Sequence, residues 1–105
     1  MIRVECTKKD DKIIDLVILG HANSAEYGKD LVCAAVSAVS LGGLNNLENP
    51  KAFLIESNEK QGLVHVKAIS DVSMHDYIVL ETILTQLKSI EAMSSKHIKV
   101  IEKGC

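Results

Sequence analysis

Residues 20–40 read GHANSAEYGKDLVCAAVSAVS, beginning where the apolar run Ile13–Leu19 stops and continuing as a helix. Asp30 is suited to cap that helix, because its carboxylate can accept a hydrogen bond from the free backbone N–H of Cys33. The dipole and the free N–H groups of a first helical turn favour negative charge on a sulfur at that position. His21 lies just past the strand, where a loop can bring its imidazole to the thiol. A thiol and an imidazole within reach are the minimum set for nucleophilic catalysis.

Polar residues in the predicted helix share one face with Cys33. Asp30, Cys33, Ser37 and Ser40 follow helical spacing, and valines and alanines occupy the flanks. A helix that only filled a core would not need this polar stripe. Taken alone, a cysteine among alanines and valines is most often a small buried hydrophobe. Asp30 is interpreted as a cap that could also orient His21, and Ser37 either bonds near the sulfur or packs.

The motif Gly-His-Ala, followed by Gly-x-Asp-Leu-Val-Cys-Ala-Ala-Val-Ser, resembles the signature of the ribosomal-processing cysteine protease family, Prp. The resemblance is dense across residues 20–40, and the length and element order of the chain fit the family from end to end. It implies that Cys33 is the nucleophile and His21 the general base and acid. Gly20, Asp30 and Ser37 are the other matched positions.

The resemblance to Prp also implies a substrate and an assembly. The substrate would be a short hydrophobic, aromatic-containing N-terminal extension of a large-subunit ribosomal protein, and the protein would be a homodimer. Thiol chemistry of this kind requires no metal and no organic cofactor. The first-turn N–H groups of Val32 and Cys33 are expected to stabilise the oxyanion.

The composition limits the classes of protein to which this chain can belong. The 105 residues are 47% hydrophobic and 25% charged, which is typical of one globular domain spanning residues 1–105. The net charge is −2 and the chain has no basic run, so it is not expected to bind nucleic acid directly. Aromatic residues make up only 3% of the chain, which leaves few rings to stack on bases.

The N-terminal sequence and the cysteines indicate a cytoplasmic protein. The first residues do not have the pattern of a signal peptide, and no apolar run approaches membrane-spanning length. Cys6, Cys33 and Cys105 are odd in number and lack C-x-x-C spacing, so neither a disulfide framework nor a metal site is predicted. We expect free thiols, with Cys6 in the core and Cys105 exposed.

Hydrophobic periodicity predicts the element order ββαββαβ, an α+β fold with one five-stranded sheet and two helices. The predicted strands run from Ile2 to Thr7, Ile13 to Leu19, Ala52 to Glu56, Leu63 to Ile69 and His97 to Glu102, and the helices from about Leu31 to about Asn46 and from the Ser73 cap to about Met93. Two of the strands are apolar on both faces, so both of their faces need to be covered by other elements. We expect the helices to lie on opposite faces, as an α/β/α sandwich; the alternative places both on one face and a second subunit on the other.

The loop between the two chemical residues is predicted to be a gate. It comprises Ala22, Asn23, Ser24, Ala25, Glu26, Tyr27, Gly28 and Lys29. It has glycines at both edges and few apolar side chains, so it should open at low cost. We therefore expect no hydrogen bond between His21 and Cys33 in the free protein. His65, His75 and His97 are assigned no chemistry.

Three functions remain open from the sequence. The first is a cysteine endopeptidase with a Cys33–His21 dyad. The second is a non-catalytic ribosome-associated module in which Cys33 only packs, and the third is a thioesterase or acyl-transfer enzyme with the same dyad. Rapid alkylation of Cys33 would exclude the second, and cleavage of a peptide rather than a thioester would separate the first from the third.

Overall fold

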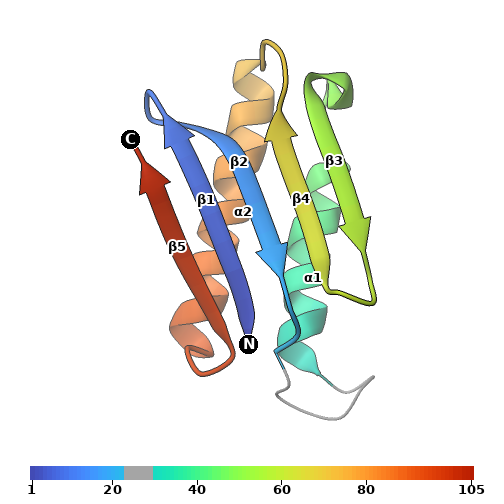
Figure 1. The fold of residues 1–105 in the computed structure, drawn as a ribbon, viewed down its shortest axis with the longest axis vertical. Helices are drawn as coiled ribbons and strands as arrows, with labels where there is room; N and C mark the ends of the chain where they lie inside the picture. The colour runs from blue at the N-terminus through green and yellow to red at the C-terminus, as the bar shows by residue number, and fades with distance from the viewer. Residues whose placement is uncertain (23–29) are drawn as a thin grey trace.

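Five strands form one mixed sheet, and two helices lie on one of its faces (Figure 1). The structure is a computed structural model that describes residues 1–22 and 30–105. The strand order is β3-β4-β2-β1-β5. The elements are β1 (Ile2–Lys9), β2 (Lys12–Leu19), α1 (Leu31–Leu44), the 3-10 turn η1 (Pro50–Ala52), β3 (Phe53–Asn58), β4 (Leu63–Ala68), α2 (Met74–Met93) and β5 (Ile98–Gly104). The α+β class and the order ββαββαβ are confirmed.

Strands β1 and β2 form the predicted antiparallel hairpin. Its turn residues Asp10 and Asp11 both have positive φ angles, a conformation that aspartate tolerates better than most residues. Strand β4 pairs antiparallel with both β2 and β3, whereas β5 pairs parallel with β1. Strands β1 and β2 are therefore central, and β3 and β5 form the two edges.

The predicted α/β/α sandwich is wrong, because both helices cover the same face (Figure 1). The two crossovers, β2-α1-β3 and β4-α2-β5, start from antiparallel strands and run in opposite directions across the sheet. Two right-handed crossovers of this kind must place their helices on one side. The helices then pack on each other, with Gly43 of α1 against the side chain of Ile83.

The core lies between this helix pair and one face of the sheet. Its buried strand residues come from β1, where they alternate, and from β2 and β4, and its helix residues come mainly from α2. They include Ile2, Val4, Cys6, Ile13, Leu16, Ile18, Val36, Val66, Leu80, Ile83, Leu84 and Leu87. On the opposite sheet face, Leu19 is 44% and Leu54 is 61% exposed. In the strands that are apolar on both faces, one face is therefore covered by neither helix. Within the described chain, no helix is both long enough and apolar enough to cross a membrane.

Both helices begin at the predicted caps. The Cys33 N–H donates to Asp30 Oδ1 over 3.0 Å, and the Asp76 N–H donates to Ser73 Oγ over 3.2 Å. Each bond satisfies a backbone donor that the first helical turn leaves without an intrahelical partner. The cap at Asp30 fixes the position of the Cys33 backbone.

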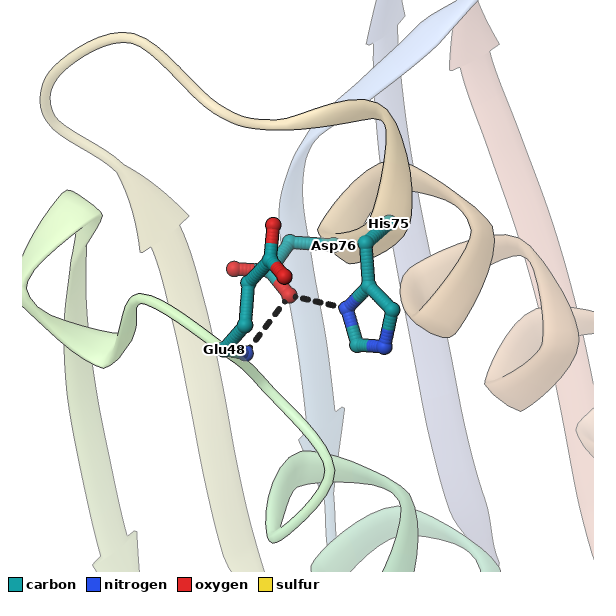
Figure 2. A group of neighbouring side chains, drawn as sticks. All are labelled: Glu48, His75 and Asp76. Atoms are coloured by element: carbon teal, nitrogen blue, oxygen red, sulfur yellow. Dashed lines mark hydrogen bonds and ion pairs between the residues drawn. The ribbon is translucent and has the colours of Figure 1, made fainter.

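The Asp76 carboxylate anchors the loop between α1 and β3 to the start of α2 (Figure 2). It is fully buried and accepts hydrogen bonds from the Glu48 N–H at 2.8 Å, the Asn49 N–H at 3.0 Å and His75 Nδ1 at 2.8 Å. Burial acts to raise the pKa of Asp76, but the hydrogen bonds from His75, Glu48 and Asn49 hold that pKa below its usual value. The side chains of Glu48, His75 and Asp76 come close together, yet both Asp76 oxygens already accept N–H groups, so the cluster serves as a loop anchor.

Candidate active site

A cleft opens where β2 ends beside the first turns of α1. Its walls come from the end of β2, one face of α1 and the β3–β4 turn, and its apolar floor from β1, β2 and β4. The lining residues are Ile2, Ile18, Gly20, His21, Cys33, Val36, Ser37, Ser40, Leu41, Ser57, Asn58, Glu59, Gly62, Leu63 and Val64. The fold thus brings four of the predicted site residues, Gly20, His21, Cys33 and Ser37, to one cleft.

Cys33 is the third residue of α1, and its thiol is half-buried at the cleft. The sulfur accepts a hydrogen bond from the Ala22 N–H over 3.3 Å. The Cys33 N–H donates to Asp30, so it is already occupied and does not fit the oxyanion role expected for it. The backbone donor that points at the sulfur comes instead from the residue after His21.

The imidazole of His21 is exposed and is held by the β3–β4 turn. Its Nε2 lies 3.0 Å from the Lys60 carbonyl oxygen. A carbonyl oxygen only accepts, so we assign the proton to Nε2, which leaves Nδ1 as an acceptor in the neutral ring. Among the described residues, the His21 ring and the Cys33 sulfur bond to Lys60 and Ala22 and not to each other.

Two glycines allow the β3–β4 turn to approach the end of β2. Gly20 has φ +104°, donates its N–H to Gln61 and Gly62 oxygens, and faces the Met1 carbonyl. Gly62 has φ +61°, and a Cβ there would collide with the Gly20 oxygen and lie 3.3 Å from His21 Cε1. Both positions therefore exclude a side chain, for reasons of conformation and of space.

The peptide of Ala22 is also held from the far end of the chain. Its carbonyl oxygen accepts a hydrogen bond from His97 Nδ1 over 3.1 Å, and its methyl group is buried. His97 directly precedes β5, which pairs with β1 beside the cleft floor. Of the predicted gate, only Ala22 is described; residues 23–29 lie outside the described residues.

The protease family model for cysteine protease Prp matches residues 1–99 of the chain. The chain belongs to the Prp family of cysteine proteases. A ribosomal processing cysteine protease Prp from Staphylococcus aureus is 32% identical over 106 aligned residues, which cover 95% of this chain and 97% of that protein. A second relative of the same description, from Mycoplasma genitalium, is 36% identical over 89 residues, covering 85% and 88%.

Solved structures of Prp have the same fold. A crystal structure of the essential ribosomal processing protease Prp from S. aureus, in complex with a covalently linked product peptide, has a TM-score of 0.88 and 31% identity. The alignment covers 98% of this chain and all of that one. The S. aureus protease in complex with a substrate peptide gives a TM-score of 0.76 at 29% identity, with the same coverage.

The other two thiols of this Prp-family protease lie outside the cleft. Cys6 is fully buried in β1, and this burial raises the pKa of its thiol to about 11, so it stays protonated at neutral pH. Cys105 is exposed at the end of the chain. Cys33 is the thiol that lines the cleft together with an imidazole.

The other residues of the predicted polar stripe are Asp30, Ser37 and Ser40. Asp30 has the capping role assigned to it, and Ser37 is exposed in the cleft one turn after Cys33. Ser40 is buried and donates to the Val36 carbonyl. Neither the Lys60 carbonyl nor His97 was found from the sequence, since both contacts join distant segments; the one local signal was the turn glycine, Gly62.

Proposed function

We propose that this cysteine protease is an endopeptidase in which Cys33 is the nucleophile and His21 the general base and acid. The supporting observation is that the Cys33 sulfur, at the first turn of α1, accepts the Ala22 N–H in the cleft that His21 lines. The hydrogen bond from His21 Nε2 to Lys60 supports it further, because a nucleophile–base pair needs a third group to orient the base.

The reaction uses both partners twice. Nδ1 of His21 takes the proton of the Cys33 thiol, and the thiolate attacks the scissile carbonyl carbon. The tetrahedral intermediate collapses when His21 returns the proton to the leaving amine, which releases one peptide and leaves a thioester on Cys33. His21 then takes a proton from water, and the resulting hydroxide attacks the thioester carbonyl carbon. The C–S bond breaks, the second peptide leaves with its new carboxyl group, and His21 returns the proton to the Cys33 sulfur.

Backbone donors near the sulfur would stabilise the oxyanion. The Ala22 N–H lies 3.3 Å from Sγ, and the Val32 N–H belongs to the same first turn as Cys33. A donor that touches the sulfur in the free enzyme is within reach of an oxygen one bond beyond the carbon that the sulfur attacks. One such donor is typically worth ~3 kcal/mol of transition-state stabilisation.

The substrate we propose is a short N-terminal extension of a large-subunit ribosomal protein, removed in the cytoplasm. The Prp relatives are described as ribosomal processing proteases, and one is crystallised with a substrate peptide. The cleft floor carries aliphatic side chains, among them Ile2, Ile18 and Val64. Such a floor suits an extension rich in hydrophobic and aromatic residues.

We also propose that the protein is a homodimer. Both helices lie on one sheet face, so the other face has no helix over it and is open to a second copy. Exposed leucines on that face, Leu19 and Leu54, support a partner there.

The test is incubation of the full chain with ribosomal proteins that carry their N-terminal extensions, read by mass spectrometry. We expect one cleavage event, lost in Cys33→Ser, whose hydroxyl is nearly isosteric with the thiol but far less easily ionised. Cys105→Ser is the matched control and should retain full activity. Wild-type rates from a folded Cys33→Ser protein would overturn the proposal, and turnover of thioesters without peptide cleavage would favour an acyl-transfer enzyme.

A further inference from the structure

We infer that His97 is a positioning residue for the catalytic thiol, acting through the backbone of Ala22. The inference rests on the proposed role of Cys33 as nucleophile. It assigns a function to a histidine that lies outside the sequence motif and that the local sequence pattern marks only as the start of a strand.

Two hydrogen bonds connect the histidine to the sulfur. His97 Nδ1 lies 3.1 Å from the Ala22 oxygen, and the Ala22 N–H donates to Cys33 Sγ over 3.3 Å. Residue 22 is therefore held on both sides, by its carbonyl and by its N–H, while its methyl group is buried in the core. These contacts fix a backbone donor that, among the described residues, reaches the sulfur from outside its own helix.

His97 is itself rigidly held. Its backbone N–H donates to the Ser94 backbone oxygen over 2.8 Å, and its backbone carbonyl accepts the Ile2 N–H over 2.9 Å where β1 and β5 begin to pair. The ring is half-buried. Since a carbonyl oxygen cannot donate, Nδ1 must carry the proton, and it does so in one neutral tautomer and in the cation.

Without the His97 bond, the Ala22 peptide would be free to turn its N–H away from the sulfur. An N–H donor stabilises a thiolate more than a thiol, because hydrogen bonds to charged groups are the stronger ones. Ala22 also follows His21 directly, so a displaced peptide would move the base. Both effects fall on the chemical step rather than on substrate binding.

A purely structural histidine would give a different result from a positioning one. If His97 only joined β5 to the rest of the fold, its loss would lower stability and leave the reactivity of the surviving folded protein unchanged. A short side chain that restores a donor near Nδ1 should rescue the positioning role. Asparagine offers that donor, leucine offers none, and aspartate has the shape of asparagine with an acceptor in its place.

The experiment compares His97→Leu, His97→Asn and His97→Asp in the full chain, each at a temperature where circular dichroism shows it folded. Two quantities are measured: kcat and KM on a peptide spanning an extension junction, and the rate of iodoacetamide alkylation at Cys33 against pH, read on the Cys33 peptide by mass spectrometry. The other titratable groups of the cleft and its cap in the described chain, His21, Glu59 and Asp30, are the same in all variants, which differ only in the group at position 97.

We expect His97→Leu to lower kcat by roughly tenfold to a hundredfold with little change in KM, and to move the alkylation profile to higher pH. His97→Asn should recover most of both, and His97→Asp should not. His75→Leu is the matched control: it breaks the 2.8 Å hydrogen bond to Asp76 at the start of α2, outside the cleft and away from the uncovered sheet face, and should change neither quantity. If His97→Leu does not fold, the variants His97→Asn and His97→Asp still compare a side chain that keeps the donor with one that lacks it.

Two results would overturn the inference. One is wild-type kcat and alkylation in folded His97→Leu or His97→Asp; the other is equal loss in His97→Asn and His97→Asp. Cys33→Ala distinguishes these failures from failure of the proposed function: if it is inactive, the nucleophile assignment stands and only the role of His97 falls. If Cys33→Ala keeps full turnover, both fall together.

Discussion

The Asp30 carboxylate connects the stability of α1 to the chemistry of Cys33, because it caps the backbone N–H of the nucleophile itself. Replacing it with alanine, Asp30→Ala, should cost about 1 kcal/mol. For a domain of this size, that corresponds to a fall in melting temperature of roughly 4–8 °C. The loosened first turn should also slow alkylation of Cys33.

Ser73→Ala is the matched control for Asp30→Ala. It removes the equivalent cap at the start of α2, the helix that does not carry the thiol. It should therefore lower the melting temperature similarly and leave alkylation of Cys33 unchanged. Unchanged stability with lost activity in Asp30→Ala would place Asp30 in the chemistry instead of in the cap.

Asp76 is a second carboxylate whose role can be measured by its pH dependence. Asp76→Asn leaves buried backbone N–H groups imperfectly paired and should cost about 2 kcal/mol at neutral pH. Because the folded protein lowers the pKa of Asp76, its ionic contribution is fully present above the unfolded pKa of about 3.9 and is lost as the pH falls further. The difference in unfolding free energy between wild type and variant should therefore shrink as the pH falls below about 4.

Urea denaturation across pH 2.5–7 measures this difference. Asp71→Asn, which removes an exposed carboxylate from the loop before α2, is the control and should cost little at any pH. A stability difference that grows as the solution is acidified would contradict the assigned direction.

At the scale of elements, the β3–β4 turn determines where the His21 ring lies. Gly62→Ala would place a methyl group against the Gly20 oxygen and close to the ring, in a left-handed conformation that alanine disfavours. We expect a loss of more than about 1 kcal/mol of stability. We also expect a fall in kcat as His21 is displaced.

Gly42→Ala provides the comparison, because nothing lies within 4 Å of the new Cβ. In the last turn of α1 this change should stabilise by up to about 1 kcal/mol and leave peptide cleavage unaffected. Equal activity in both variants would show that the turn does not position the base.

The elements themselves were predictable from local sequence, and their long-range contacts were not. Caps depend on residues three apart, so Asp30 and Ser73 were identified correctly, and helix α2 ends at the predicted Met93. The strand predicted from Ala52 begins one residue later, because Pro50–Ala52 form a 3-10 turn. The partners of His21 and Ala22 come from segments 39 and 75 residues away, and no local pattern encodes such distances.

At the scale of the molecule, the position of the helices depended on strand order. The sequence showed that some strands are apolar on both faces, but it did not show that the crossovers from β2 and from β4 run in opposite directions. That order decides the face each helix covers, because the handedness of a crossover is nearly invariant. The site motif needed no such information, since the cap and the thiol lie within four residues.

The uncovered sheet face leads to a prediction about assembly. Light scattering coupled to gel filtration should give twice the mass of one chain, and Leu54→Glu, on that face, should give the mass of one chain. Met93→Glu changes an even more exposed residue at the end of α2 and should leave the dimer intact. A wild-type mass of 11.4 kDa at micromolar concentration would contradict the dimer.

The parallel pairing of β1 with β5 has a consequence for the order of events during synthesis. Cys33 and His21 leave the ribosome before Ile98–Gly104, which must then return to pair with β1. Contacts between such distant segments form late, because the entropy of closing a long loop must be overcome first. His97 docks beside β1, so a nascent chain would carry its thiol and imidazole before the Ala22 peptide is anchored. Maturation of the active site would then wait until residues 97–104 pair with β1.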